Sequence, residues 1–201
     1  MDYSTNDGRT WSPFTVGTTI VTLANIGDEV CFRGTNSAMS GSYNSNYNYF
    51  VMSGQISASG NINSLLDGNN YQTMTTVPRY AYSRLFNNCT ALVDAEHLIL
   101  GGTTTSQNCF GHGMFAGCSN LVNGPEIMAT SFVTYAAEYM FQNCSSLASV
   151  KIHRTESSWN QNQTQSWMSG VPGTGTFYYN GTVTTRGVSY IPEGWTITQF
   201  S

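Results

Sequence analysis

Met114-Phe-Ala-Gly-Cys-Ser-Asn-Leu121 is the stretch of sequence that decides the fold, because close copies of it lie on both sides. The copies are Leu85-Phe-Asn-Asn-Cys-Thr-Ala-Leu92 and Met140-Phe-Gln-Asn-Cys-Ser-Ser-Leu147. Each of these repeat phrases has an apolar pair ending in Phe, with Cys three residues and Leu six residues after that Phe. The Phe positions are 86, 115 and 141, so the periods are 29 and 26 residues. Periods in this range are typical of stacked supersecondary units.

The recurring Phe, Cys and Leu positions predict three rows of inward-facing side chains. Residues three apart share a helix face, so we expect Phe and Cys at the end of a short helical turn. The small polar pair after each Cys favours a tight turn, and the Leu then opens an extended run. One unit cannot bury this set alone, whereas stacked units can. The predicted core rows are Phe86, Phe115 and Phe141, then Cys89, Cys118 and Cys144, then Leu92, Leu121 and Leu147.

The repeat phrases resemble BspA-type leucine-rich repeats, in which Met-Phe or Ala-Phe is followed by Gly/Asn-Cys, Ser/Thr, a small residue and Leu. The first phrase departs only in having Leu85 in place of Met. The linking Pro125-Glu-Ile-Met-Ala-Thr130 is similar to the family's Pro-Glu-Leu-Pro-Ala-Thr, with Met128 replacing the second Pro. The resemblance implies an α+β repeat fold, a BspA-like leucine-rich-repeat solenoid with a β-rich N-terminal cap and a β C-terminal cap.

The flanking segments extend the resemblance. Tyr3-Ser-Thr-Asn-Asp-Gly-Arg-Thr-Trp11 and Ile191-Pro-Glu-Gly-Trp195 are similar to segments in surface proteins of gut Bacteroidales and in structural proteins of their phages. The resemblance therefore implies a non-enzymatic display or adhesion protein. Its expected location is extracellular, on a cell surface, or on the virion surface if the chain is phage-encoded.

The expected organisation has four parts. They are a hairpin-rich N-terminal cap at 1–48, a degenerate first repeat at 49–78, three repeats at 79–154 and a C-terminal cap at 155–201. In the N-terminal cap, Asn6-Asp7-Gly8 predicts a hairpin turn, and residues 18–23 and 29–33 predict two strands around a second turn. In the C-terminal cap, residues 173–179 and 194–200 predict two further strands.

Composition excludes several classes of function. Charged residues make up 9% of the 201 residues, the net charge is −4, and Lys151 is the only lysine, which argues against a nucleic-acid partner. No apolar stretch approaches the roughly 18 residues needed to span a bilayer, so we expect no membrane insertion. The polar, acidic start does not resemble a secretory signal peptide.

Catalytic, metal and cofactor sites are not expected. The five cysteines are an odd number without metal-ligand spacing, and we expect all of them, Cys31 and Cys109 included, to be small buried hydrophobes. The three histidines are dispersed and accompany no evident nucleophile. Glu96, Glu126 and Glu138 lie near repeat boundaries and are expected to be solvated. The sequence therefore predicts no enzyme and no cofactor.

A loop rich in Ser, Asn, Gly and Tyr is the candidate binding segment. It spans residues 35–48 and carries Tyr43 and Tyr47, with Tyr49 following directly. Tyrosine beside small polar residues is typical of adaptable binding surfaces. The alternative is a solvated loop whose rings cover nearby apolar surface.

Two functions remain open from the sequence. The first is a recognition or adhesion module that binds a cell-surface glycan or protein. The second is a structural virion domain, in a fibre, decoration or tail, that acts by assembly with a homo-oligomeric or virion partner and binds no small ligand.

Overall fold

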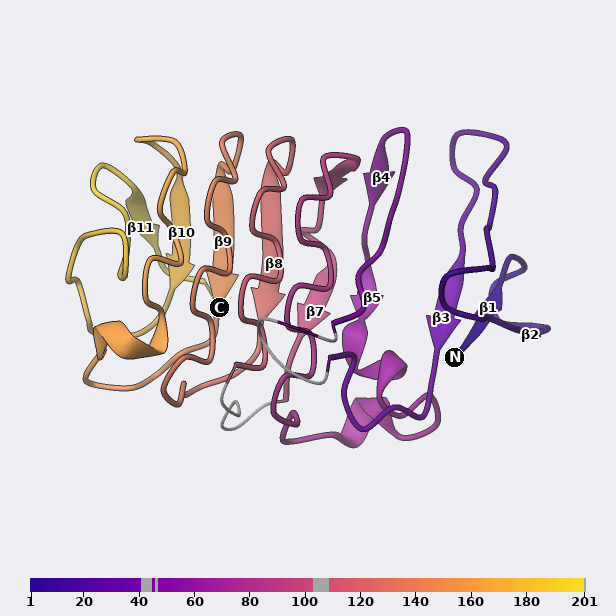
Figure 1. Ribbon diagram of the computed structural model, residues 1–201. Coiled ribbons are helices and arrows are strands. Elements are labelled where there is room, and N and C mark those ends of the chain that lie inside the picture. The colour runs from indigo at the N-terminus through magenta and orange to yellow at the C-terminus, as the bar shows by residue number, and fades with distance from the viewer. Residues whose placement is uncertain (41–44, 46, 103–108, 201) are drawn as a thin grey trace.

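The computed structural model describes residues 1–40, 45, 47–102 and 109–200. Over these residues the chain contains eleven short β-strands and three short 3-10 helices, and no α-helix. The strands form two sheets, one of three strands and one of eight (Figure 1). The 3-10 helices are η1 (Ile62–Leu65), η2 (Tyr71–Thr73) and η3 (Gln161–Gln163).

The small sheet lies at the N-terminal end of the molecule. Its strands are β1 (Asp2–Ser4), β2 (Ser12–Pro13) and β3 (Cys31–Arg33), all antiparallel, with β1 in the middle. The turn between β1 and β2 is held by the Ser4 hydroxyl, whose Oγ accepts a hydrogen bond of 3.0 Å from the Gly8 amide. The strand predicted at residues 18–23 does not form, because this segment pairs with neither sheet.

The large sheet runs along the rest of the chain in sequence order, with every pairing among its described strands parallel. Figure 1 shows successive strands side by side, each connected to the next by chain that passes beside the sheet. Its strands are β4 (Ile56–Ser57), β5 (Gly60–Asn61), β6 (Leu92–Asp94), β7 (Leu98–Leu100), β8 (Asn123–Ile127), β9 (Ser149–Ile152), β10 (Thr176–Tyr179) and β11 (Thr196–Thr198).

The predicted α+β leucine-rich-repeat solenoid is therefore wrong. The repeat phrases, where we expected short helical turns, consist of consecutive tight turns. Backbone φ is positive at every fourth residue leading into the first phrase and within it, 60° at Tyr80, 59° at Arg84 and 57° at Asn88, and a right-handed helix cannot contain such residues. Alternate amides donate to the next unit, as the Phe86 amide does to the Met114 carbonyl at 2.9 Å, and the amides between them close turns within their own unit, as the Cys89 amide does to the Phe86 carbonyl at 3.0 Å. The sequence spacing of three suited a helix, but it arises from successive turns that also bond sideways to the next unit.

Aligned strands bury one face of the large sheet. Leu100 pairs with Ile127, Ile127 with Ile152 and Ile152 with Tyr179, and all four side chains are buried. Successive side chains along a strand point to opposite faces of the sheet, so the residues next to these four point outward. Lys151 and Glu126, which precede two of these positions, are accordingly only partly buried.

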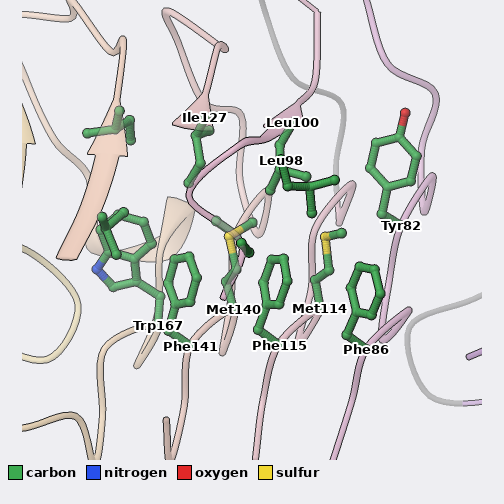
Figure 2. Close-up of a cluster of buried hydrophobic side chains, with 14 of the residues drawn as sticks. Tyr82, Phe86, Leu98, Leu100, Met114, Phe115, Ile127, Met140, Phe141 and Trp167 are labelled. Carbon is green, nitrogen blue, oxygen red and sulfur yellow. The ribbon is translucent and has the colours of Figure 1, made fainter. Parts of the chain in front are cut away.

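A ladder of aromatic rings runs through the hydrophobic core from one repeat phrase to the next. Ring centroids are 5.5 Å apart for Phe50 and Phe86, 5.4 Å for Phe86 and Phe115, and 5.5 Å for Phe115 and Phe141. Trp167 continues the ladder 6.0 Å beyond Phe141 (Figure 2). Because each ring comes from a different part of the chain, the ladder fixes which segments become neighbours.

Candidate functional site

Residues 47–52 form an aromatic rim beside the first repeat phrase. The Phe50 amide donates to the Leu85 carbonyl at 2.9 Å, and the Phe50 ring stacks on Phe86. With Phe50 turned into the core, its neighbours Tyr49 and Val51 are left 54% and 85% exposed. One inward aromatic residue thus determines which side chains face solvent.

A groove lies between this rim and the end of the first repeat phrase. Its volume is about 300 Å³, and it is partly open to solvent. The centroids of the Tyr47 and Tyr49 rings are 5.9 Å apart, and the ring planes are inclined at 45° to each other. The groove is lined by Tyr47, Tyr49, Phe50, Val51, Met52, Asn87, Asn88, Cys89 and Thr90. We call this set the tyrosine groove.

The opposite wall of the tyrosine groove is made of carboxamide and hydroxyl groups. Asn87 is fixed by a hydrogen bond of 3.0 Å from its Nδ2 to the Ala116 carbonyl, and its Oδ1 accepts from Asn88 Nδ2 at 3.3 Å. The Asn88 side chain also packs over Gly117, where an added Cβ would lie 2.2 Å from Asn88 Oδ1. The wall is therefore held by the next repeat.

The electrostatic character of the groove is neutral. None of its nine lining residues is charged. Beside the aromatic side, the guanidinium carbon of Arg84 lies 5.5 Å from the centre of the Tyr47 ring. A cation at this distance is attracted to the ring face and helps to hold the ring in place. Aromatic surface facing fixed amides suits a ligand with both apolar faces and hydroxyl groups.

The structure brings together two of the three tyrosines that the sequence singled out. Tyr47 and Tyr49 lie in the groove, whereas Tyr43 lies outside the described residues. Asn87, Asn88 and Thr90 were not predicted as site residues, because they belong to a repeat phrase and fitted turn chemistry. The inward Phe50 was the available clue, since its alignment with Phe86 places the two segments side by side.

The nine residues assigned to the core rows are all buried. Phe86 and Cys89, nearest the N-terminal end, are 5% and 6% exposed, and the other seven are fully buried. All five cysteines are free thiols. Cys31 differs from the buried thiol that we expected, because it is only half-buried in β3.

Two glutamates that were expected to be solvated are partly buried and contact histidine or lysine side chains, so that expectation is wrong. Glu138 Oε2 lies 3.1 Å from His112 Nδ1, and burial raises the pKa of Glu138. Glu126 Oε1 lies 2.9 Å from Lys151 Nζ and 2.6 Å from His153 Nε2. Burial acts to raise the pKa of Glu126, but hydrogen bonds from Lys151 and His153 outweigh it and lower that pKa.

A buried arginine supports the C-terminal part of the core. The Arg154 guanidinium carbon lies 4.5 Å from the centre of the Trp159 ring and 5.1 Å from that of Phe132. Glu156 forms an ion pair with it, and one guanidinium nitrogen donates to the Ser158 carbonyl at 3.2 Å. Burial lowers the pKa of Arg154, and the Glu156 charge opposes that change. These contacts make Arg154 a packing residue.

Within the described ranges, no group of three or more His, Cys, Asp or Glu residues could hold a metal ion. The same part of the chain has no helix that is long and apolar enough to cross a bilayer. Compared with known proteins, the chain matches no family model, no curated protein and no solved structure.

Proposed function

We propose that this chain is a non-catalytic recognition module that binds a neutral cell-surface glycan in the tyrosine groove. The single observation that carries the proposal is the composition of that groove. Two tyrosine rings 5.9 Å apart face fixed asparagine side chains, and no lining residue is charged. Ligand sites typically combine apolar and aromatic surface with a few placed polar groups, as this one does.

The two sides of the groove would contribute differently to binding. The Tyr47 and Tyr49 rings offer stiff apolar faces that lose little conformational entropy when covered. Asn88 and Thr90 offer amide and hydroxyl groups to ligand hydroxyls. Because Asn87 and Asn88 are already positioned by Ala116 and Gly117, little ordering is required on binding.

Neutrality supports a neutral ligand. An anionic polysaccharide would gain from lysine or arginine in the groove, and the lining has neither. The resemblance of the repeat phrases to bacterial and phage surface proteins supports display on a cell or virion surface. Together these points favour an uncharged surface polysaccharide as the ligand class.

A binding screen tests the proposal. The full chain is passed over immobilised neutral and acidic surface polysaccharides, alongside the variants Tyr49→Ala and Tyr135→Ala. Tyr135 is the matched control, because it is 42% exposed and is not among the groove residues. Truncating an aromatic hot spot costs at least about 1.4 kcal/mol, which corresponds to a factor of ten, so we expect Tyr49→Ala to weaken binding at least roughly tenfold.

The expected pattern is retention on at least one neutral polysaccharide by wild type and Tyr135→Ala, with retention lost in Tyr49→Ala. Retention on acidic polysaccharides alone would contradict the proposed ligand class. Equal binding by Tyr49→Ala and wild type would show that the tyrosine groove is not the binding site.

A structural role through assembly is the second candidate, and one observation favours it. Val51 is 85% exposed beside the groove, and an apolar side chain in that position would be well covered by another protein. A stable oligomer that buries Tyr49 and Val51 would favour this role over glycan recognition. Differential hydrogen exchange at residues 47–52 across a concentration series distinguishes the two.

A further inference from the structure

The loop between β2 and β3 carries a partly exposed segment with the composition of a strand. Residues 18–23 read Thr-Thr-Ile-Val-Thr-Leu, a run rich in β-branched residues. Figure 1 shows the loop at the end of the molecule that carries the N-terminus. Ile20 is 88% exposed, and Val16 in the same loop is 60% exposed. An exposed apolar segment of this kind is typical of an interaction surface.

Turns hold both ends of this segment. At its start, the Thr18 and Thr19 amides donate to the Thr15 carbonyl at 3.3 and 3.0 Å. After it, the Asp28 carboxylate accepts from the amides of Ala24 and Asn25 at 3.0 and 2.9 Å. From Ile20 to Leu23 the described structure records no backbone hydrogen bond. The backbone groups of a β-prone segment are therefore available for pairing.

We propose that residues 18–23 pair, as an antiparallel strand, with the same segment of a second copy of this chain. Antiparallel pairing of identical segments is isologous, so one twofold axis satisfies both copies and closes the assembly as a dimer. It would place Ile20 of one copy directly opposite Ile20 of the other at the axis, where cross-strand apolar and β-branched pairs are favourable.

Charge distribution favours a second copy as the occupant. No charged residue occurs between Arg9 and Asp28, so the segment can meet its own copy without repulsion. If Ile20 of one copy faces Ile20 of the other, Asp28 and Glu29 fall opposite residues 12 and 11, which are uncharged. Like charges directly opposite would destabilise such a pair, and this register has none.

Dimer formation would not use the tyrosine groove, since none of the groove residues belongs to the loop. A dimer would carry two grooves on one particle. Linking two sites raises the overall avidity for a repetitive ligand without any new contact in either site.

Sedimentation velocity of the full chain over a concentration series tests the proposal. We expect a monomer–dimer equilibrium for wild type and a dissociation constant raised at least tenfold in Ile20→Lys and in Val21→Pro. The lysine introduces like charges across the axis, and the proline removes a donor from the pairing edge. Ile26→Lys is the control, because Ile26 is even more exposed but lies in the turn beyond the segment.

A dimer retained by Ile26→Lys and lost in the other two variants supports strand pairing. A wild-type chain that stays monomeric at all concentrations overturns the proposal. So does a dimer that survives both Ile20→Lys and Val21→Pro, or one that Ile26→Lys dissociates equally, since that would reflect general apolar association.

Discussion

The Cys118 thiol donates a hydrogen bond of 2.9 Å to the Phe86 carbonyl oxygen of the preceding repeat phrase. Cys144 makes the same bond to the Phe115 carbonyl at 3.1 Å. The cysteine row is thereby tied to the phenylalanine row one repeat earlier. Both cysteines are fully buried, which keeps these weak donors away from water.

Burial raises the pKa of the Cys118 thiol above its ordinary value and that of Cys144 to about 12. Because the thiolate is the reactive form, we expect neither residue to react with iodoacetamide in the native protein at pH 8. Half-buried Cys31 should be modified first. Peptide mass spectrometry before and after addition of urea measures this order. Native labelling of Cys118 at the rate found in urea would contradict its burial.

Phe115→Ala should destabilise the protein by about 3–5 kcal/mol, the usual cost of emptying a core phenylalanine site. The residue is fully buried and stacks on a ring at 5.4 Å on one side and 5.5 Å on the other. Urea denaturation monitored by tryptophan fluorescence gives the change. Tyr135→Ala, at a 42% exposed position, is the control and should cost less than about 0.5 kcal/mol. A loss below about 1 kcal/mol for Phe115→Ala would show that the ring ladder contributes little to stability.

Gly113→Ala should cost about 1–2 kcal/mol through the backbone alone, since φ is +56° and side chains rarely adopt that conformation. A Cβ at Gly113 has room, with its nearest neighbour, Arg84 Cγ, 3.6 Å away. Gly173→Ala is the matched control, because nothing lies within 4 Å and φ is outside the left-handed region. It should be neutral or slightly stabilising. Equal unfolding midpoints for the two variants would contradict the turn geometry of the repeat phrases.

Acidification should destabilise the protein through His112. Burial, aided by the nearby Arg84 charge, lowers the pKa of His112 to about 4, against about 6.5 for an unfolded histidine. Between these pH values the unfolded chain binds a proton that the folded chain does not, so the folded state loses stability as the pH is lowered. From pH 7 to pH 5 this amounts to about 2 kcal/mol. The raised pKa of Glu138 acts in the opposite direction just above pH 4.5 and reduces the effect there.

Urea midpoints at pH 7 and pH 5 measure this dependence in wild type and in His112→Gln. In the glutamine variant, the urea midpoints at pH 7 and pH 5 should differ much less than in wild type, whatever the stability of the variant at pH 7. An unchanged pH dependence in His112→Gln would assign the effect to other groups.

The repeat period indicated in advance that Phe86, Phe115 and Phe141 recur in equivalent positions, and these residues form consecutive rings of the ladder. The secondary structure of the phrases was predicted wrongly, because a spacing of three fits both a helix face and a series of turns. Gly113 and Gly117, four residues apart, were a clue to positive φ. That clue was weak, since Arg84, directly before the first phrase, and Asn88 within it stand at the equivalent places.

The glutamate–histidine contacts were missed because glutamates were judged by their local sequence. His112 reaches Glu138 and Glu126 reaches His153, steps of 26 and 27 residues, which match the repeat period. Partners one period apart were thus predictable in principle. The far wall of the tyrosine groove was harder to predict, because Phe50 is a single clue and residues 47–52 lack the Cys and Leu that would have aligned them with the first phrase.

Backbone amide chemical shifts, followed while a neutral surface polysaccharide retained by the chain is titrated in, test the proposed recognition role most directly. The account predicts concentration-dependent shifts concentrated at residues 47–52 and 87–90, and their absence in Tyr49→Ala. Shifts confined to other parts of the chain, or equal shifts in wild type and Tyr49→Ala, would contradict binding in the tyrosine groove.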